Sequence, residues 1–176
     1  GSPGRDWNVA TGMVIEGKAG FQIMGDWAKG EFTAAGKVPG VDYYCAPTPS
    51  NNGYLYNVDS FIFYKTSDPE KQEGQKLLAK LMMGKNFQKV FNLYKGSIPA
   101  RLDVSMDEFD KCAKTSNSDI KTAGASGGLV PSFAHGMAQG NTMKAALQDV
   151  ITEHFNSDMS SVDAANALAD SVLDNM

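Results

Sequence analysis

The sequence predicts a helix-rich α/β fold with few strands. After residue 68 the apolar residues recur mostly at helical spacing, often behind Ser or Asp residues typical of helix starts. Two short apolar runs bounded by glycine or turn residues are typical of strands. Helices of this kind pack on a sheet, and so few strands do not build one. We therefore expect the chain of 176 residues to be incomplete.

The N-terminal part of the sequence predicts a helix, a strand and a second helix. Residues 7–16 have the composition of a short helix that ends at a glycine. Residues 19–25 form a mostly apolar run closed by glycine, which suits a strand. Asp26 is expected to cap the next helix, which carries Trp27 and ends at Gly36.

The middle of the chain predicts one strand followed by two helices. Residues 58–64 are rich in aromatic and branched side chains, as strands are. The sequence Asp-Pro-Glu at 68–70 combines a cap, a first-turn proline and an acid near the positive end of the helix dipole. This helix is expected to stop at Gly84. A second helix, with apolar residues between 87 and 94, is expected to stop at Gly96.

Three serine–acid pairs in the C-terminal part match the capping box of helix N-termini: Ser105 with Glu108, Ser116 with Asp119, and Ser160 with Asp163. Residues 124–128 are glycine-rich and predict a flexible link. Two helices are expected to close the chain, one over 141–155 and one after the last capping box.

Composition and motifs exclude several classes of function. The net charge is -4 without a basic patch, so nucleic acid is not an expected partner. No apolar run approaches the roughly 20 residues that span a bilayer. The first five residues do not form a signal peptide, so an export signal is expected upstream or already removed. The chain lacks GxSxG, HExxH, P-loop and GxGxxG motifs, and we expect no catalytic residues, cofactor or metal.

Cysteine usage leaves two possibilities open. Cys45 and Cys112 do not form a CxxC motif and have no histidine pair nearby, so a zinc site is not expected. The two thiols could be buried separately or joined in a disulfide, and spacing alone does not decide between these.

Residues 17–28 (GKAGFQIMGDWA) resemble a strand-to-helix signature of family-1 extracellular solute-binding proteins, and more closely of their glucose- and mannose-binding branch. Four further segments agree with that family in order and rough spacing: 57–61 (NVDSF), 67–81, 95–101 (KGSIPAR) and 131–136 (PSFAHG). The final pair of helices completes the match, which covers essentially the whole chain.

The resemblance implies a two-lobed periplasmic-binding-protein fold of type II, of which this chain carries pieces of both lobes. Residues 1–57 and 103–176 resemble second-lobe sequence, and residues 58–102 resemble a first-lobe strand with two helices. Because members of the family are more than twice as long, we expect a C-terminal fragment. A disulfide between Cys45 and Cys112 is also implied by the resemblance, in keeping with an oxidising compartment.

The resemblance assigns sugar contacts to five residues: Trp7, Trp27, Asp59, Lys95 and His135. Aromatic faces pack on the C–H face of a sugar ring, while charged groups bond its hydroxyls. Each residue also has an ordinary structural explanation. The tryptophans suit a core or rim, Asp59 a strand-end cap, Lys95 a helix C-terminus and His135 a satisfied structural site.

The expected function is binding of a glucose-like monosaccharide for uptake by an ABC importer. The implied partners are the sugar and the membrane permease subunits, the expected location is the periplasm, and no enzymatic activity is expected. The alternative is a truncated fragment that binds no ligand and acts as a structural or self-associating module. Exposed edges of a broken sheet would favour such self-association.

Overall fold

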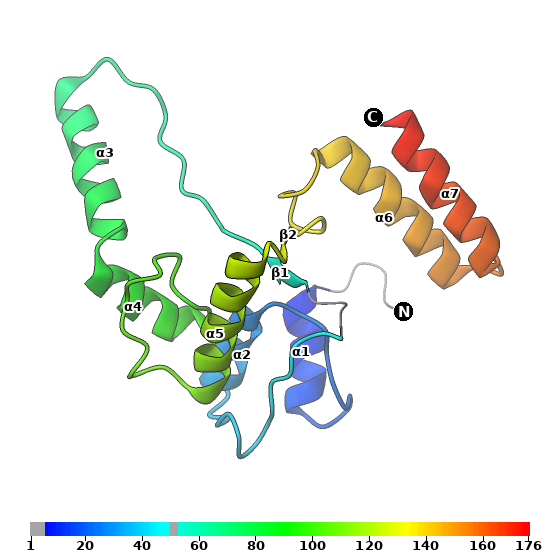
Figure 1. Cartoon of the computed structure of the whole chain (residues 1–176), viewed down its shortest axis with the longest axis horizontal. Coiled ribbons are helices and arrows are strands. Elements are labelled where there is room, and N and C mark those ends of the chain that lie inside the picture. Colours follow the sequence, from blue (N-terminus) through cyan, green and yellow to red (C-terminus); the bar gives the residue numbers. More distant parts are fainter. Residues whose placement is uncertain (1–5, 50–52) are drawn as a thin grey trace. The chain divides into compact units, whose positions relative to one another are not determined.

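The computed structural model describes residues 6–49 and 53–176, and helices dominate this part of the chain (Figure 1). The first five residues, on which the signal-peptide expectation rests, lie outside the described residues. Two short strands pair in parallel, so the helix-rich α/β prediction is confirmed. The chain divides into a larger unit, residues 6–49 and 58–127, and a smaller unit, residues 53–57 and 128–176.

The larger unit contains five α-helices and one short 3-10 helix within its described residues. They are α1 (Trp7–Ile15), η1 (Asp26–Ala28), α2 (Lys29–Ala34), α3 (Pro69–Met82), α4 (Lys85–Lys95) and α5 (Lys111–Ser126). Helix α1 packs on α2, and α4 packs on both α2 and α3. The apolar core is small: Ala28, Met82, Val104, Phe109, Ala113 and Ala123.

Because that core is small, polar and covalent links carry much of the packing around α5. Lys29 is only 6% exposed, and its Nζ lies 2.7 Å from Oδ2 of Asp110, the residue that caps α5. Next to this cap, Cys112 forms a disulfide with Cys45, as the resemblance implies (Cα–Cα 5.7 Å). The segment after α2 is further held by Tyr43, whose ring stacks on Phe32 with centroids 4.2 Å apart.

Local signals placed several helix ends correctly. The carboxylate of Asp68 accepts the backbone N–H groups of Glu70 and Lys71 at 3.0 and 3.3 Å, which confirms the predicted start of α3. Helix α4 ends at Gly96, whose φ of 88° lies in the left-handed region that favours glycine.

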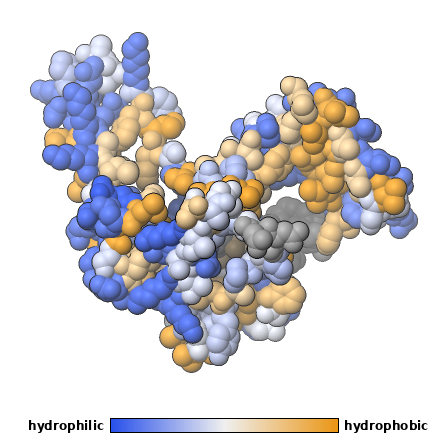
Figure 2. Space-filling view, in the orientation of Figure 1, coloured by the Kyte–Doolittle hydropathy of each residue, from blue (hydrophilic) through white to orange (hydrophobic). Residues whose placement is uncertain are grey.

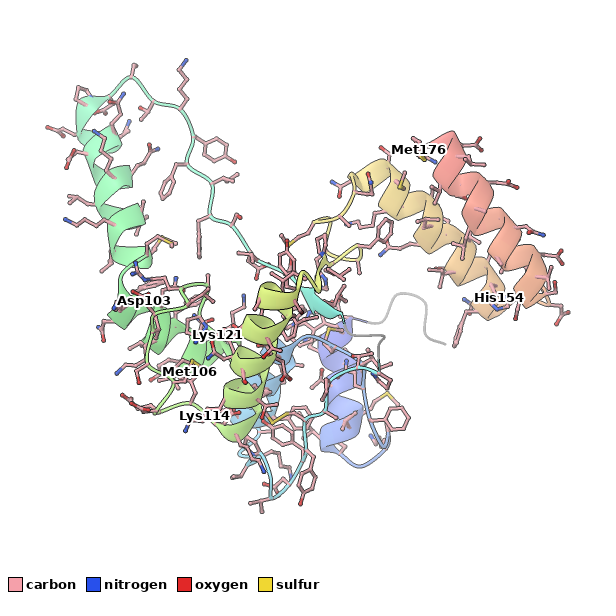
Figure 3. The ribbon with its side chains drawn as sticks, in the orientation of Figure 1. Asp103, Met106, Lys114, Lys121, His154 and Met176 are labelled. Atoms are coloured by element: carbon pink, nitrogen blue, oxygen red, sulfur yellow. A yellow bond between two sulfur atoms is a disulfide. The ribbon has the colours of Figure 1, made fainter. Side chains whose placement is uncertain are left out.

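The smaller unit is a strand pair followed by a helical hairpin. Strands β1 (Tyr54–Tyr56) and β2 (Leu129–Pro131) pair in parallel register. Helices α6 (Asn141–Asn156) and α7 (Ser161–Asp174) lie side by side (Figure 1). At the connection between them, Nδ1 of His154 lies 2.9 Å from the carbonyl oxygen of Met159 (Figure 3). Ser160 accepts the backbone N–H of Asp163 at 3.1 Å, so this capping box is confirmed.

Both predicted strands are wrong, because residues 19–25 and 58–64 have no regular secondary structure. A strand is stabilised by hydrogen bonds to a neighbouring strand, and within the described residues the pairing instead involves 54–56. The run at 58–64 is open to solvent: Phe61 is 62% exposed and Tyr64 80%.

Two of the three predicted capping boxes are also wrong. Ser105 instead closes a tight turn in which its Oγ accepts the N–H of Asp107 at 3.2 Å. Helix α5 begins later, at Lys111, and Ser116 lies in its interior. Both serine–acid pairs match the spacing of a cap, but Asp110 supplies the cap that α5 uses, accepting the N–H of Ala113 at 2.8 Å.

Helices α3 and α4 carry large apolar side chains at the surface of the larger unit. Leu77 and Leu81 of α3 are 60% and 61% exposed, and Tyr94 of α4 is 82% exposed. Figure 2 shows such hydrophobic side chains lying at the surface among hydrophilic ones. An open hollow on α4 is lined by Phe87, Val90, Phe91, Tyr94 and Lys95. Within the described part of the chain, none of the helices has the length and hydrophobicity needed to cross a membrane.

Candidate functional site

Trp27 lies in η1, at the step between an extended segment and α2, and its side chain is half-buried. The indole folds back over Gly25, so closely that a methyl group there would overlap its six-membered ring. Gly25 has φ -69° and ψ 162°, a conformation that any residue adopts. The contact with the indole, and not the backbone, therefore requires glycine at this position.

Lys95 is the last residue of α4, and its ammonium group lies in a polar contact with Asp59. The Nζ of Lys95 is 2.5 Å from Oδ2 of Asp59, and their side chains are 31% and 63% exposed. The same Nζ lies 5.8 Å from the centre of the Phe91 ring, within the range of a cation–π contact. The structure thus brings together two of the five expected site residues.

The segments that carry Trp27 and Lys95 are in close backbone contact. A methyl group added at Gly30 would lie 2.8 Å from the carbonyl oxygen of Lys95, and one at Gly96 would lie 2.6 Å from the nitrogen of Gly30. The two glycines therefore allow the N-terminal end of α2 to approach the C-terminal end of α4. This contact links the Trp27 segment with Lys95 and Asp59.

Asp26 connects the same two segments. Its Oδ2 accepts the backbone N–H of Ile98 at 3.1 Å, across 72 residues of sequence. The expectation that Asp26 caps the next helix is wrong, because Gly25 is the cap residue of η1 and makes no side-chain capping bond. Burial raises the pKa of the Asp26 carboxyl above 3.8, and the charges of Lys29 and Lys95 and the Ile98 N–H oppose this rise.

Sequence reasoning treated Asp26 as a local cap and missed this link. The available signal was an acid placed between an apolar run and a tryptophan, where a carboxylate is costly without partners. Nothing in the sequence indicated that the partner would be the backbone of Ile98.

Trp7 lies in the first turn of α1, and its side chain is 39% exposed. Its carbonyl oxygen accepts hydrogen bonds from Thr11 Oγ1 at 3.0 Å and Gln22 Nε2 at 3.1 Å. The Thr11 bond lies within α1, while the Gln22 bond joins the start of α1 to the extended segment that leads towards Trp27. Trp7 thus belongs to the larger unit, on a different helix from Lys95.

His135 belongs to the smaller unit, in a turn after β2. Its Nδ1 lies 2.6 Å from Oγ of Ser132, which is 2% exposed. The turn is closed by a bond from the N–H of Met137 to the carbonyl oxygen of Ser132 at 3.0 Å. The imidazole itself is exposed, with a defined orientation set by the buried serine.

The chemistry that these groups offer is hydrogen bonding and ring packing. Across residues 6–49 and 53–176, His, Cys, Asp and Glu side chains do not gather in threes as they would around a metal ion. Lysine supplies three donors and an aspartate about four acceptor sites, so each of these groups can take part in more than one hydrogen bond. Such a pair suits a ligand whose neighbouring hydroxyls both donate and accept.

No family model matches the chain. Among curated proteins, it is 47% identical over 170 residues to a probable sugar-binding periplasmic protein of Brucella suis, covering 96% of this chain and 40% of the relative. It is 45% identical over 170 residues to a probable sugar-binding periplasmic protein of Rhizobium meliloti, covering 96% and 41%.

A more distant relative is an uncharacterized ABC transporter extracellular-binding protein of Pyrococcus horikoshii. It is 34% identical over 150 residues, covering 85% of this chain and 33% of the relative. The chain is therefore similar over nearly its whole length to proteins named as sugar-binding periplasmic proteins, and it spans about two fifths of their length.

Proposed function

We propose that this chain is part of a two-lobed binding protein of type II fold that holds a glucose-like monosaccharide for an ABC importer in the periplasm. The observation that carries the proposal is the Lys95–Asp59 pair, which lies where the Trp27 segment meets the end of α4. Similarity to proteins named as sugar-binding periplasmic proteins supports the same assignment. The proposed role is binding and delivery, without catalysis.

In this proposal, Lys95 and Asp59 bond adjacent sugar hydroxyls. Lys95 donates to one hydroxyl oxygen, and Asp59 accepts from a neighbouring hydroxyl, while the two side chains keep their own contact at 2.5 Å. Charge-assisted bonds of this kind are stronger than bonds between neutral groups. The cation–π contact of Lys95 with Phe91 limits the freedom of the lysine head group before the sugar arrives.

Trp27 is assigned as the aromatic platform for the sugar ring. Its position above Gly25 fixes the plane of the indole, so little side-chain entropy remains to be lost on binding. Trp7 is assigned as a second aromatic contact from α1. A rigid aromatic face packs on the apolar C–H side of a pyranose, and the charged pair bonds the hydroxyl groups at its edge.

His135 is assigned as a donor to a further hydroxyl. Nδ1 of His135 lies 2.6 Å from Oγ of Ser132, and this contact sets the orientation in which the ring would meet the sugar. Closure of the two proposed lobes around the sugar is part of the proposal.

The exposed apolar residues of α3 and α4 support the proposed division into lobes: 1–57 and 103–176 in the second lobe, and 58–102 in the first. Leu77 and Leu81, together with the hollow around Phe91, would pack on first-lobe sequence outside this chain. Without that sequence, the same surface favours self-association of the isolated chain. Light scattering over a range of concentrations tests this, and a strict monomer at every concentration would contradict it.

Calorimetric titration of the full-length protein with D-glucose tests the proposal. We expect saturable binding that falls by about tenfold or more in Trp27→Ala, Asp59→Asn and Lys95→Met, because each loses a direct contact. Lys89→Met is the matched control, since Lys89 lies on the same helix and pairs with Glu108 at 2.7 Å. It should bind as the unaltered protein does.

Two outcomes would contradict the proposal. Absence of binding to D-glucose and to other monosaccharides would contradict the proposed function. An equal loss of affinity in Lys89→Met would contradict the assigned site. The isolated 176-residue chain should bind weakly or not at all, because the proposed cleft needs the remaining sequence. A submicromolar Kd for the isolated chain would show that it does not.

A further inference from the structure

We propose that Asp26 is a positioning residue of the sugar site, which rests on the function proposed above. Its carboxylate holds the loop after α4 through the Ile98 N–H, and so keeps Lys95 at a fixed distance from the segment that carries Trp27. Asp26 itself would not contact the sugar.

The first support is the place of the bond between Asp26 and Ile98. Asp26 directly precedes Trp27, and Ile98 lies three residues after Lys95. The bond of 3.1 Å therefore joins the immediate neighbourhoods of two proposed ligand contacts that are distant in sequence. A shift at either end of this bond would move Trp27 and Lys95 relative to one another.

The second support is that the other links of this loop lead back to α4 itself. Ser97 Oγ donates to Asn92 at 2.8 Å, and the N–H of Ala100 donates to Gln88 at 3.1 Å. Both partners lie on α4, so these bonds shape the loop without placing it against η1. The bond from the Ile98 N–H to Asp26, by contrast, holds the loop against η1.

The third support is the backbone contact between Gly30 and the turn at Gly96. A methyl group on either glycine would come within 2.8 Å of the opposite backbone, so the two segments already touch. Van der Waals contact resists closer approach, while the Asp26–Ile98 bond resists separation. Together they define the spacing, which a binding site needs to within a fraction of an ångström.

A structural helix cap is the competing explanation, and the geometry argues against it. The cap positions of η1 and α2 are Gly25 and Ala28, and Asp26 is the first residue of η1, inside the helix. Its carboxylate accepts the Ile98 N–H from another part of the chain, and this bond lowers the pKa of Asp26 more than the N–H of the neighbouring Trp27 does. Burying a carboxylate is costly, and the raised pKa of Asp26 reflects that cost.

The experiment compares Asp26→Ala, Asp26→Asn and Asp42→Ala in the full-length protein. Asparagine keeps an oxygen that can accept the Ile98 N–H, while alanine does not. Asp42→Ala is the matched control, because Oδ2 of Asp42 also accepts a backbone N–H, from Val38 at 2.7 Å, in the same unit. The readouts are D-glucose affinity by calorimetry, hydrogen exchange of the Ile98 amide, and Trp27 emission in a background in which every other tryptophan is replaced by phenylalanine.

We expect Asp26→Ala to weaken D-glucose binding by about tenfold, as the loss of one bond to a charged group would, with faster exchange at Ile98 and shifted Trp27 emission. Asp26→Asn should restore affinity to within about threefold and restore slow exchange at Ile98. Asp42→Ala should change none of these readouts. If Asp26→Ala does not fold, Asp26→Ser takes its place, with the same expected losses.

Three outcomes would overturn the inference: unchanged affinity in Asp26→Ala, equal losses in Asp26→Ala and Asp26→Asn, or unchanged Ile98 exchange in Asp26→Ala. A failure of the proposed function looks different. In that case the unaltered protein binds no sugar, while Ile98 exchange and Trp27 emission still report whether Asp26 fixes the two segments.

Discussion

Gly25 lies directly beneath the indole of Trp27, and there is no room between them for a methyl group. The backbone of Gly25 is in an ordinary extended conformation, with φ -69° and ψ 162°. The need for glycine at position 25 is therefore explained by the Trp27 ring, which leaves no room for a side chain. Because Trp27 is the proposed platform for the sugar, this contact ties a backbone position to the geometry of the site.

Gly25→Ala should displace the Trp27 ring and destabilise the chain by about 1–3 kcal/mol, because the added methyl overlaps atoms of the indole. Near-ultraviolet circular dichroism and tryptophan emission measure the displacement, and urea unfolding measures the free energy. Gly20→Ala is the control, since a methyl there meets nothing within 4 Å. Equal spectra and equal stability for both variants would contradict the contact.

Cys45→Ser with Cys112→Ser should lower the free energy of unfolding. The disulfide joins residues 67 apart in sequence, and loop-closure entropy of that length corresponds to roughly 4 kcal/mol. A reducing agent should destabilise the unaltered protein to a similar extent and leave the double variant unchanged. Two free thiols in the unfolded, non-reduced chain would show that the bridge does not form.

Tyr43→Phe should leave stability unchanged or raise it by up to about 1 kcal/mol. The Tyr43 hydroxyl is buried with no hydrogen-bond partner among the described residues, while its ring stacks on Phe32. Burial, together with the charge of Asp110, raises the pKa of Tyr43 to about 12. Tyr44→Phe is the control, because Tyr44 is 83% exposed. A loss of more than about 1 kcal/mol in Tyr43→Phe would indicate a partner for the hydroxyl.

The free energy of unfolding of Asp26→Asn, relative to that of the unaltered chain, should increase as pH rises from 3.8. Burial raises the pKa of Asp26 in the folded state, so with rising pH the carboxyl ionises first in the unfolded chain. Between the unfolded and the folded pKa, the free energy of unfolding of the unaltered chain therefore falls as pH rises. The stability contributed by the protonated carboxyl is present below pH 3.8 and is lost as pH passes the raised folded pKa. Lys29 and Lys95 face this carboxyl and reduce the size of the effect. Urea unfolding of both proteins between about pH 3.5 and 7 measures it, and a difference that shrinks with rising pH would contradict the sign.

The sequence predicted those parts of the fold that depend on local interactions. Asp68 caps α3 through N–H groups two and three residues ahead, and Ser160 caps α7 in the same way. Gly96 ends α4 because a left-handed residue is needed there. Each of these signals is complete within a few residues, so it could be read without the structure.

Interactions between distant segments could not be predicted in this way. The run at 58–64 has strand-like residues, but forming a strand depends on a neighbour that the sequence does not name. The bond between Asp26 and Ile98 spans 72 residues, and the Lys95–Asp59 pair spans 36. The family resemblance assigned a sugar contact to Lys95 and to Asp59 separately. The structure shows that the two side chains are in direct contact.

The most direct test of the central claim is a fluorescence titration of the full-length Trp7→Phe protein with D-glucose. Trp27 is then the one tryptophan contributed by these 176 residues. Tryptophan residues in the rest of the protein are replaced by phenylalanine, so the emission reports on the proposed platform alone. We predict a saturable change in emission with D-glucose, no change with glycerol, and loss of the response in Lys95→Met. An emission that stays constant while calorimetry shows sugar binding would place the sugar away from Trp27 and contradict the assigned site.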